Sequence, residues 1–138
     1  MLTHQTAQFV PVVLAALFTI PIGMMWFSHA FFAEPWMRLS KVTPQMMKRG
    51  PGASAYASSL LSAFVMAYTL STLMRIMQMQ TVAEGCALAG LLWLAFVLLP
   101  SITSALFSKK PMALVLINSG YELTKALMMA TVLTIYWK

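Results

Sequence analysis

The sequence has 138 residues, of which 60% are hydrophobic and 9% charged, whereas roughly one quarter of the residues in a soluble domain are charged. This composition excludes an ordinary soluble domain and predicts an integral membrane protein. The formal net charge is +6, but six of the nine basic residues lie in two short loops that determine membrane topology, so we expect no nucleic-acid partner.

Four apolar segments follow one another along the chain. Asp, Glu, Lys and Arg are absent from residues 1–33, 50–74 and 85–108, and each run exceeds the roughly 20 residues that a helix needs to cross a membrane. We expect the spans at residues 8–32, 53–77, 82–106 and 112–136. Long continuous apolar runs differ from the short alternating strands of a β-barrel. The sequence therefore predicts an all-α fold, a polytopic membrane four-helix bundle that forms one transmembrane domain over residues 1–138.

The basic residues predict how this bundle is oriented. The first loop carries Arg38, Lys41, Lys48 and Arg49, the third loop carries Lys109 and Lys110, and the opposite side has only Arg75 and Lys138. Lys and Arg are enriched in cytoplasmic loops. We therefore expect both basic loops in the cytoplasm, both termini outside in the periplasm, and a multi-pass protein of the bacterial inner membrane. Anionic lipid headgroups are the expected partner of the first loop.

The first loop contains the signals of a short helix in the segment "TPQMMKRG", residues 43–50. Thr43 can cap the helix, Pro44 suits its first position, and Gly50 can take the left-handed conformation that closes it. The loop therefore predicts a short interfacial helix at the cytoplasmic surface.

The end of the first span and the start of the first loop form a candidate cytoplasmic rim, made of Trp26, Ser28, His29 and Trp36. The two tryptophans suit the depth of the lipid headgroups, while Trp93 lies deeper and is interpreted as packing. A histidine at the rim could sense pH or relay a proton. Hydrogen bonding to a carbonyl group or to water is its more ordinary role.

The second span carries small residues at a spacing of four, namely Ala55, Ser59, Ala63, Ala67 and Ser71. Such a stripe lets another helix backbone approach closely, either within the bundle or between protomers. A polar permeation path lined by the serines is the alternative interpretation of the same stripe.

The fourth span contains a polar stripe made of Asn118, Tyr121, Glu122 and Lys125. At a rise of 1.5 Å per residue, Glu122 lies about 15 Å and Lys125 about 20 Å from the cytoplasmic start of the span. A spacing of three places the two charges on one helix face, where they can pair. The stripe must face the bundle interior or another subunit, because lipid cannot solvate it.

Two functions are open for this stripe. As a structural device, the paired charges neutralise each other and fix how the fourth span docks. As a mechanism, Glu122 is a proton or cation site whose affinity Lys125 tunes. We favour the structural interpretation, because an internal salt bridge neutralises the charge that transport would use.

Enzymatic and metal-binding functions find little support in the sequence. Two histidines and one cysteine cannot provide a zinc or iron–sulfur ligand set within one chain. No nucleophile lies in a recognisable catalytic motif. We therefore expect no enzymatic activity and no metal site, and the sequence names no cofactor.

Two segments resemble a known family. "WFSHAFFAEPWMR" at residues 26–38 and "INSGYELTKALMMA" at residues 117–130 resemble the bacterial domain-of-unknown-function family 1761, and the resemblance covers nearly the whole chain. The signature positions here are Trp26, Phe27, Ser28, Trp36, Asn118, Gly120 and Tyr121. Phe27 stands where Tyr is more usual, and Glu34 with Pro35 replaces a frequent Gly–Lys pair. The resemblance implies a small four-span inner-membrane protein and no established activity.

Taken together, these features predict a structural or accessory subunit that acts through homo-oligomeric or hetero-oligomeric assembly in the membrane. The first alternative is a small oligomeric proton-coupled or ion transporter that uses the polar stripe at Glu122 and Lys125. The second alternative is a binder of a lipid, a quinone or a pigment between aromatic-rich helices.

Overall fold

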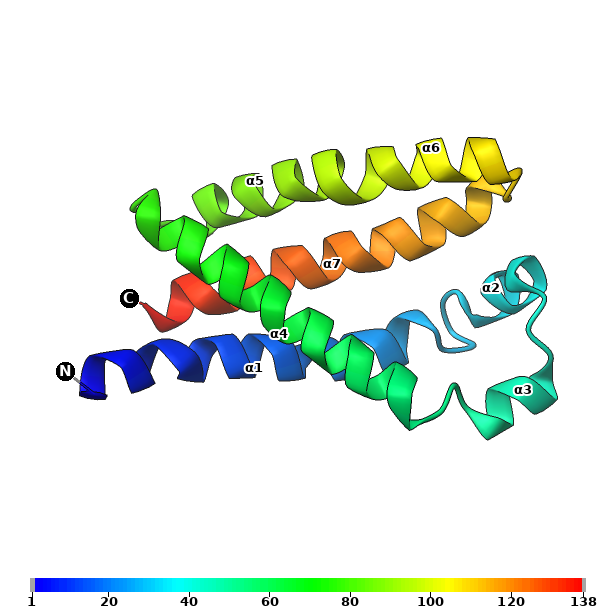
Figure 1. Cartoon of the computed structure of the whole chain (residues 1–138), viewed down its shortest axis with the longest axis horizontal. Coiled ribbons are helices and arrows are strands. Elements are labelled where there is room, and N and C mark those ends of the chain that lie inside the picture. Colours follow the sequence, from blue (N-terminus) through cyan, green and yellow to red (C-terminus); the bar gives the residue numbers. More distant parts are fainter. Residues whose placement is uncertain (1, 138) are drawn as a thin grey trace.

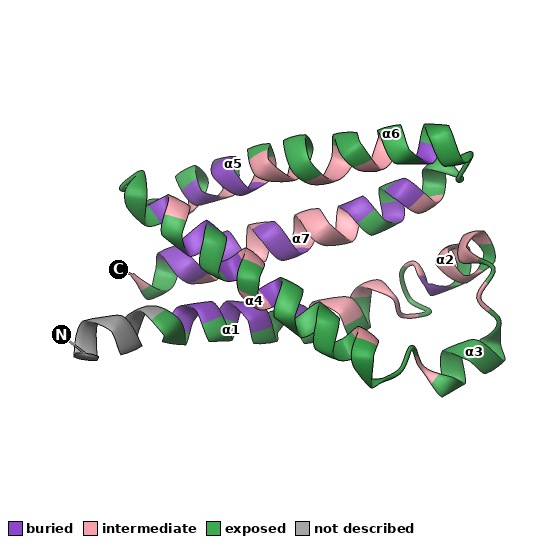
Figure 2. Ribbon diagram, in the orientation of Figure 1, coloured by how far each residue is buried: buried purple, intermediate pink, exposed green. Residues whose placement is uncertain are grey.

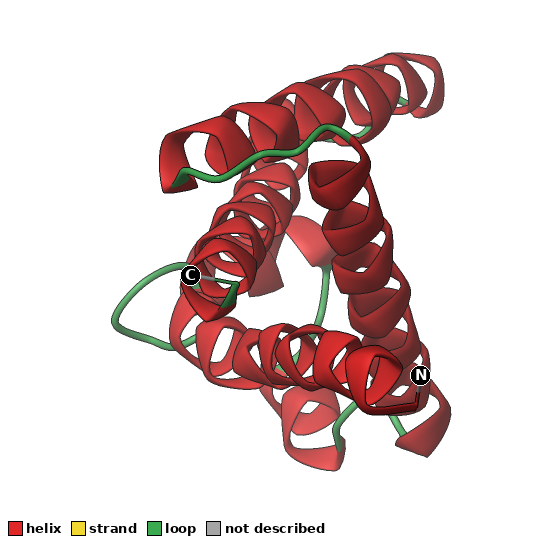
Figure 3. Ribbon diagram, turned by 90° about the vertical axis from the view of Figure 1, so that its left-hand side faces the viewer, coloured by secondary structure: helices red, strands yellow, loops and turns green. Residues whose placement is uncertain are grey.

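The computed structural model describes the backbone of residues 2–137 and the side chains of residues 9–137. Within this part of the chain there are helices and short connections and no strand, which confirms the predicted all-α fold (Figure 3). The elements are α1 (Leu2–Trp26), α2 (Ala33–Ser40), α3 (Pro44–Arg49), α4 (Ala53–Ile76), α5 (Val82–Trp93), a π-helical turn η1 (Leu94–Leu98), α6 (Leu99–Ser108) and α7 (Met112–Tyr136).

Helix α7 is the central element of the bundle. It packs against α5 on one side and α1 on the other, and α4 crosses both α1 and α7 obliquely before the chain turns into α5 (Figure 1). The short helices α2 and α3 and the turn between α6 and α7 lie at one end of the molecule. Both basic loops are therefore at the same end, and the turn between α4 and α5 is at the other.

Three helical segments are long and apolar enough to cross a membrane: Phe9–Trp26, Ala53–Ile76 and Val82–Ser108. The fourth expected span, residues 112–136, is a helix over the same residues, but its charged and polar side chains keep it out of this set. The structure thus provides three candidate spans, and the crossing of a membrane by α7 remains a prediction.

The first helix differs from the expected span at residues 8–32, because it begins at Leu2 and ends at Trp26. The chain then turns sharply: the Ser28 hydroxyl donates to the Met25 carbonyl at 2.7 Å, and the Phe32 amide donates to the Trp26 carbonyl at 3.1 Å. Apolar composition continues through these residues, so hydropathy alone extended the prediction beyond the real helix end. Helix α2, which follows directly, was not predicted.

The short helix in the first loop does occur, as α3. The Thr43 side chain accepts a hydrogen bond from the Met46 amide at 3.2 Å, and Pro44 occupies the first turn. Gly50 ends the helix with a φ of 70°, a backbone conformation that glycine adopts without strain. Local capping signals were therefore sufficient to locate this helix, whereas its position relative to a membrane surface is part of the proposal below.

The core lies where α4 crosses α1 and α7, as the buried residues of Figure 2 show. Much of it consists of alanine, namely Ala15, Ala16, Ala63, Ala67, Ala89, Ala126 and Ala130. Small side chains let helix backbones approach closely, which is how membrane helices gain packing energy without a hydrophobic driving force. Met74, Met129 and Leu133 are fully buried and fill the remaining space.

Gly85 lies where α5 packs closely against α4 and α7. A Cβ atom at this position would lie 2.7 Å from the Met74 Cε atom, 3.2 Å from the Thr134 hydroxyl oxygen and 3.5 Å from the Ala130 Cβ atom. The Met74 side chain can move away, but Thr134 is buried on α7 and has little freedom to do so. The absence of a side chain at Gly85 therefore sets the separation of α5 from α7.

The third apolar segment is interrupted by η1 just before Pro100. Proline has no backbone N–H, and its ring clashes with the carbonyl group four residues earlier, here Phe96. A wider π-helical turn at residues 94–98 relieves this conflict without ending the helix. The segment Val82–Ser108 therefore continues as one long helix with a local change of winding.

The close approach at Gly85 generates a first prediction. Gly85→Leu forces atoms into occupied space, and we expect it to lower the free energy of unfolding by about 1–3 kcal/mol, as overpacking does elsewhere. Gly90→Leu on the same helix is the matched control, because a Cβ atom there meets nothing within 4 Å. Thermal unfolding in detergent micelles, followed by circular dichroism, measures both variants. Equal stability of the two would contradict this account of the packing.

Candidate functional site

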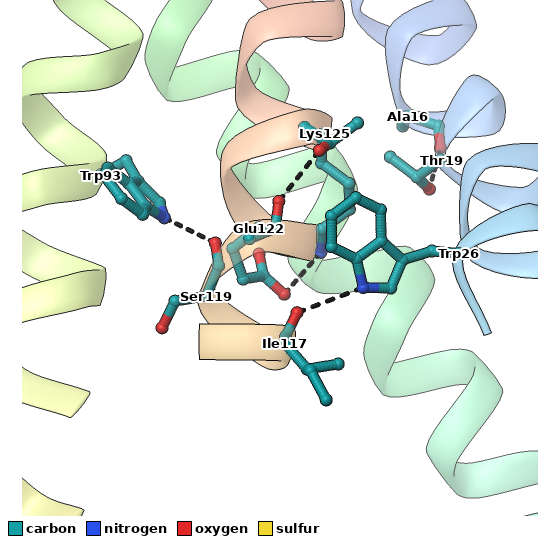
Figure 4. Close-up of polar contacts among 10 residues, drawn as sticks. Ala16, Thr19, Trp26, Trp93, Ile117, Ser119, Glu122 and Lys125 are labelled. Carbon is teal, nitrogen blue, oxygen red and sulfur yellow. Dashed lines mark hydrogen bonds and ion pairs between the residues drawn. The ribbon is translucent and has the colours of Figure 1, made fainter. Parts of the chain in front are cut away.

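Two tryptophan side chains donate hydrogen bonds to the backbone of one turn of α7, from opposite sides. The Trp26 indole N–H from α1 donates to the Ile117 carbonyl at 3.2 Å, and the Trp93 indole N–H from α5 donates to the Ser119 carbonyl at 2.7 Å (Figure 4). Each carbonyl oxygen has a second lone pair available for such a bond. The two bonds therefore hold α7 between its neighbours without interrupting its helical hydrogen bonds.

A third tryptophan reaches the same turn through a side chain. The Trp36 indole N–H, from α2, donates to the Asn118 Oδ1 atom at 3.2 Å. Helix α2 is thereby fixed against α7. Three indole N–H groups thus converge on three successive residues of α7.

Aromatic rings fill the space around this turn. The Phe27 ring lies edge-on to both the Trp36 ring, at a centroid distance of 5.4 Å, and the Tyr121 ring, at 5.1 Å. Trp26 and Phe32 lie 4.7 Å apart between ring centroids. Edge-to-face and tilted pairs at these distances are favourable beyond the area they bury. The cluster therefore joins α1, the turn after it and α2 to α7.

Two glycines make room for the aromatic rings. A Cβ atom on Gly120 would lie 3.1 Å from the Trp26 ring, and one on Gly23 would lie 2.8 Å from the Tyr121 hydroxyl oxygen. Each helix thus offers a glycine to the large side chain of the other. This reciprocal contact sets the register between α1 and α7.

One turn further along α7, Glu122 and Lys125 form the ion pair that their spacing predicts. The Lys125 Nζ atom lies 2.8 Å from the Glu122 Oε1 atom and 4.6 Å from the centre of the Tyr121 ring. Lys125 is buried, with 10% of its side chain exposed, whereas 35% of the Glu122 side chain is exposed. The lysine is therefore enclosed by the chain, and the carboxylate remains partly open at its surface.

The other predicted residues lie apart from this cluster. Ser28 bonds to the end of its own helix, and His29 is exposed in the turn before α2. In the small-residue stripe, Ala63, Ala67 and Ser71 are buried, Ala55 is half-buried and Ser59 is exposed. Among the described residues, no three His, Cys, Asp or Glu side chains are grouped to hold a metal ion.

Sequence reasoning missed the roles of Trp93 and Ser119. The sequence predicts packing for Trp93 and indicates no role for Ser119, because the bond uses the Ser119 backbone carbonyl rather than its hydroxyl. A backbone acceptor leaves no trace in the sequence. The only available signal was a tryptophan deep in an apolar span, since a buried indole N–H usually finds a partner.

A family model described as "Protein of unknown function (DUF1761)" matches residues 10–134. The chain belongs to this family. It matches no curated protein and no solved structure.

The signature positions of the DUF1761 resemblance come from two distant parts of the sequence, and the structure brings most of them together. Trp26, Phe27 and Trp36 contact the turn of α7 that contains Asn118 and Tyr121. The candidate functional site is this contact region, in which Trp26, Phe27 and Trp36 meet residues 117–122, together with Phe32, Trp93 and Lys125.

The indole bond at Trp93 generates a second prediction. Trp93→Phe keeps an aromatic ring but removes the donor to the Ser119 carbonyl, and we expect the free energy of unfolding to fall by about 1 kcal/mol. Phe96→Ala is the control, because the Phe96 side chain is 75% exposed in the same segment, and a surface change of this kind is expected to cost within about 0.5 kcal/mol. Denaturation in mixed micelles measures both. A Trp93→Phe variant as stable as the wild type would show that the bond does not anchor α7.

Proposed function

We propose that the chain is a four-span membrane protein that works as a structural or accessory subunit, through assembly with copies of itself or with another membrane protein. Three apolar helices support the membrane location. Helix α7 is the proposed fourth span: it has 25 residues, about 37 Å at 1.5 Å per residue, which is enough to cross the hydrocarbon core. Its position between α1 and α5 surrounds most of its polar residues with protein.

The partly exposed carboxylate of Glu122 carries this proposal. Glu122 lies about 15 Å along α7, near the middle of the proposed membrane span. With 35% of its side chain exposed, it presents polar atoms where lipid cannot solvate them. Another protein surface that covers Glu122 would remove this cost. A subunit interface at this position therefore explains why Glu122 is partly exposed although its partner Lys125 is buried.

The contacts of the cluster within the chain support a structural role for Glu122 over a role in transport. Lys125 already neutralises Glu122 at 2.8 Å and is itself buried. The tryptophan bonds and the aromatic cluster fix α7 in one arrangement. A group that must release and rebind an ion is served poorly by an internal partner of opposite charge.

The proposed orientation follows from charge. The six basic residues of the two loops gather at one end of the molecule, and we place this end in the cytoplasm of a bacterial cell, with the inner membrane around the bundle. Helix α3 then lies at the membrane surface. Its last turn carries Lys48 and Arg49, which can contact anionic headgroups.

Native mass spectrometry of the protein extracted gently from its own membrane tests the proposed assembly. We expect a mass greater than that of one chain for the wild type. Glu122→Ala removes the group that the interface covers and leaves Lys125 without its partner, so we expect at least a tenfold loss of the complex. Glu34→Ala is the matched control, because Glu34 is an exposed acid in the first loop. A wild-type monomer, or a Glu122→Ala complex as stable as the wild type, would overturn the proposal.

The same partly exposed carboxylate favours a second function, proton-coupled or ion transport by a small oligomer. A carboxylate in the middle of a membrane span is an ordinary site for a proton or a cation. In this case the Lys125 ammonium tunes the affinity of Glu122, and the opening at Glu122 is the route of access.

Flux measurements in liposomes distinguish the two functions. If Glu122 carries the ion, Glu122→Gln abolishes proton or cation flux while the helical circular dichroism spectrum is unchanged, and Glu34→Gln leaves the flux intact. Wild-type flux in the Glu122→Gln variant would eliminate transport through this residue and leave assembly as its role.

A further inference from the structure

A groove lined by both polar and apolar residues runs between α6 and α7 at the basic end of the bundle, separate from the ion pair. It has a volume of about 350 Å³ and is open along its outer side. Leu114 and Val115 are among its apolar lining residues, and its polar lining residues are Ser101, Ser104, Lys110, Asn118 and Ser119. The groove therefore starts at the loop between α6 and α7 and continues along the flank of α7.

The polar lining of this groove is rich in hydrogen-bond donors. Lys110 contributes an ammonium group, and Ser101 and Ser104 contribute hydroxyls. The Asn118 Oδ1 atom accepts from the Trp36 indole, which leaves the amide N–H₂ group as the donor of that side chain. No carboxylate is part of the lining. A site that offers hydrogen-bond donors and one cationic group, and no acidic group, suits a ligand with negatively charged oxygen atoms.

The residues around the groove are also positively charged. Lys109 precedes Lys110, and the first loop brings the basic residues of α2 and α3 to the same end of the molecule. Like charges around a concave site raise the local concentration of anions. Leu114 and Val115 lie about one turn along α7 from Lys110, and the polar residues Asn118 and Ser119 follow one turn later, so polar and apolar groups alternate along the groove.

We propose that this groove binds the headgroup of an anionic phospholipid. The Lys110 ammonium pairs with the phosphate, and Leu114 and Val115 contact apolar parts of the lipid. The serine hydroxyls and the Asn118 amide, which lies about two turns along α7 from Lys110, donate to phosphate, glycerol or ester oxygens. The proposal rests on the membrane location proposed above. A phospholipid fits better than free phosphate because the lining combines a lysine at the loop with the apolar side chains of Leu114 and Val115, and because the groove is open on its outer side.

Titration of the detergent-solubilised protein with phosphatidylglycerol or phosphatidylcholine, followed by native mass spectrometry, tests this site. We expect preferential retention of phosphatidylglycerol by the wild type. Lys110→Gln removes one basic contact, worth about 1 kcal/mol near a membrane surface, and should weaken phosphatidylglycerol binding about fivefold. Lys109→Gln is the matched control with the same change of charge at the next residue outside the groove, and we expect less than a twofold effect.

A second variant tests the shape of the groove without changing its charge. Ser104→Leu places a large side chain in the lining of the groove and should weaken phosphatidylglycerol binding as much as Lys110→Gln does. Circular dichroism confirms that each variant keeps its helices. Equal effects of Lys109→Gln and Lys110→Gln, or wild-type binding by Ser104→Leu, would overturn the proposal in favour of general surface attraction.

Competition separates a lipid from a free anion. Inorganic phosphate at millimolar concentration should leave phosphatidylglycerol bound, because it cannot replace the acyl contacts. Displacement by phosphate would overturn the lipid assignment. A failure of this proposal is distinguishable from a failure of the proposed assembly, because the first changes the lipid adducts of each chain and the second changes the number of chains in the complex.

Discussion

Hydrogen bonds from tryptophan side chains to the backbone of α7 hold the helix that carries the ion pair between two apolar ones. Trp26 and Trp93 come from α1 and α5 and meet successive parts of the same turn. A bond to a backbone carbonyl does not depend on the side chain at that position, so it fixes the location of the helix itself. The glycine contacts at Gly23 and Gly120, the aromatic cluster and the position of the ion pair all require this placement.

The helices pack differently at the two ends of the bundle. Toward the turn between α4 and α5, alanines and Gly85 allow the helix backbones to approach closely, and a few large side chains such as Met74 fill the space. Toward the basic end, aromatic rings separate the helices and indole N–H groups bond across the gap. Close packing thus gives way to hydrogen bonding where α7 becomes polar, because small apolar side chains could not satisfy Asn118 or Lys125.

The sequence was sufficient for the all-α fold, for helices α4 and α7, and for the pairing of Glu122 with Lys125, because each depends on local composition or local spacing. It was sufficient for α3 because capping residues determine a helix end. The end of α1 could not be predicted in this way, since a turn stabilised by backbone bonds has the same apolar composition as the helix before it. The hydrogen bonds to Ile117 and Ser119 could not be predicted either, because their acceptors are backbone atoms.

The π-helical turn at Leu94–Leu98 also changes which residues of the third apolar segment meet α7. One extra residue in the turn rotates the following helix relative to a regular continuation. Phe96, which a regular helix would place on the face of Trp93, is 75% exposed, whereas Val97 is half-buried and Ala105 is buried. The segment is therefore two amphipathic surfaces out of phase with each other. Its first surface presents Gly85 and Trp93 to α7, and its second presents the serines of the groove, although hydropathy describes both as one uniform span.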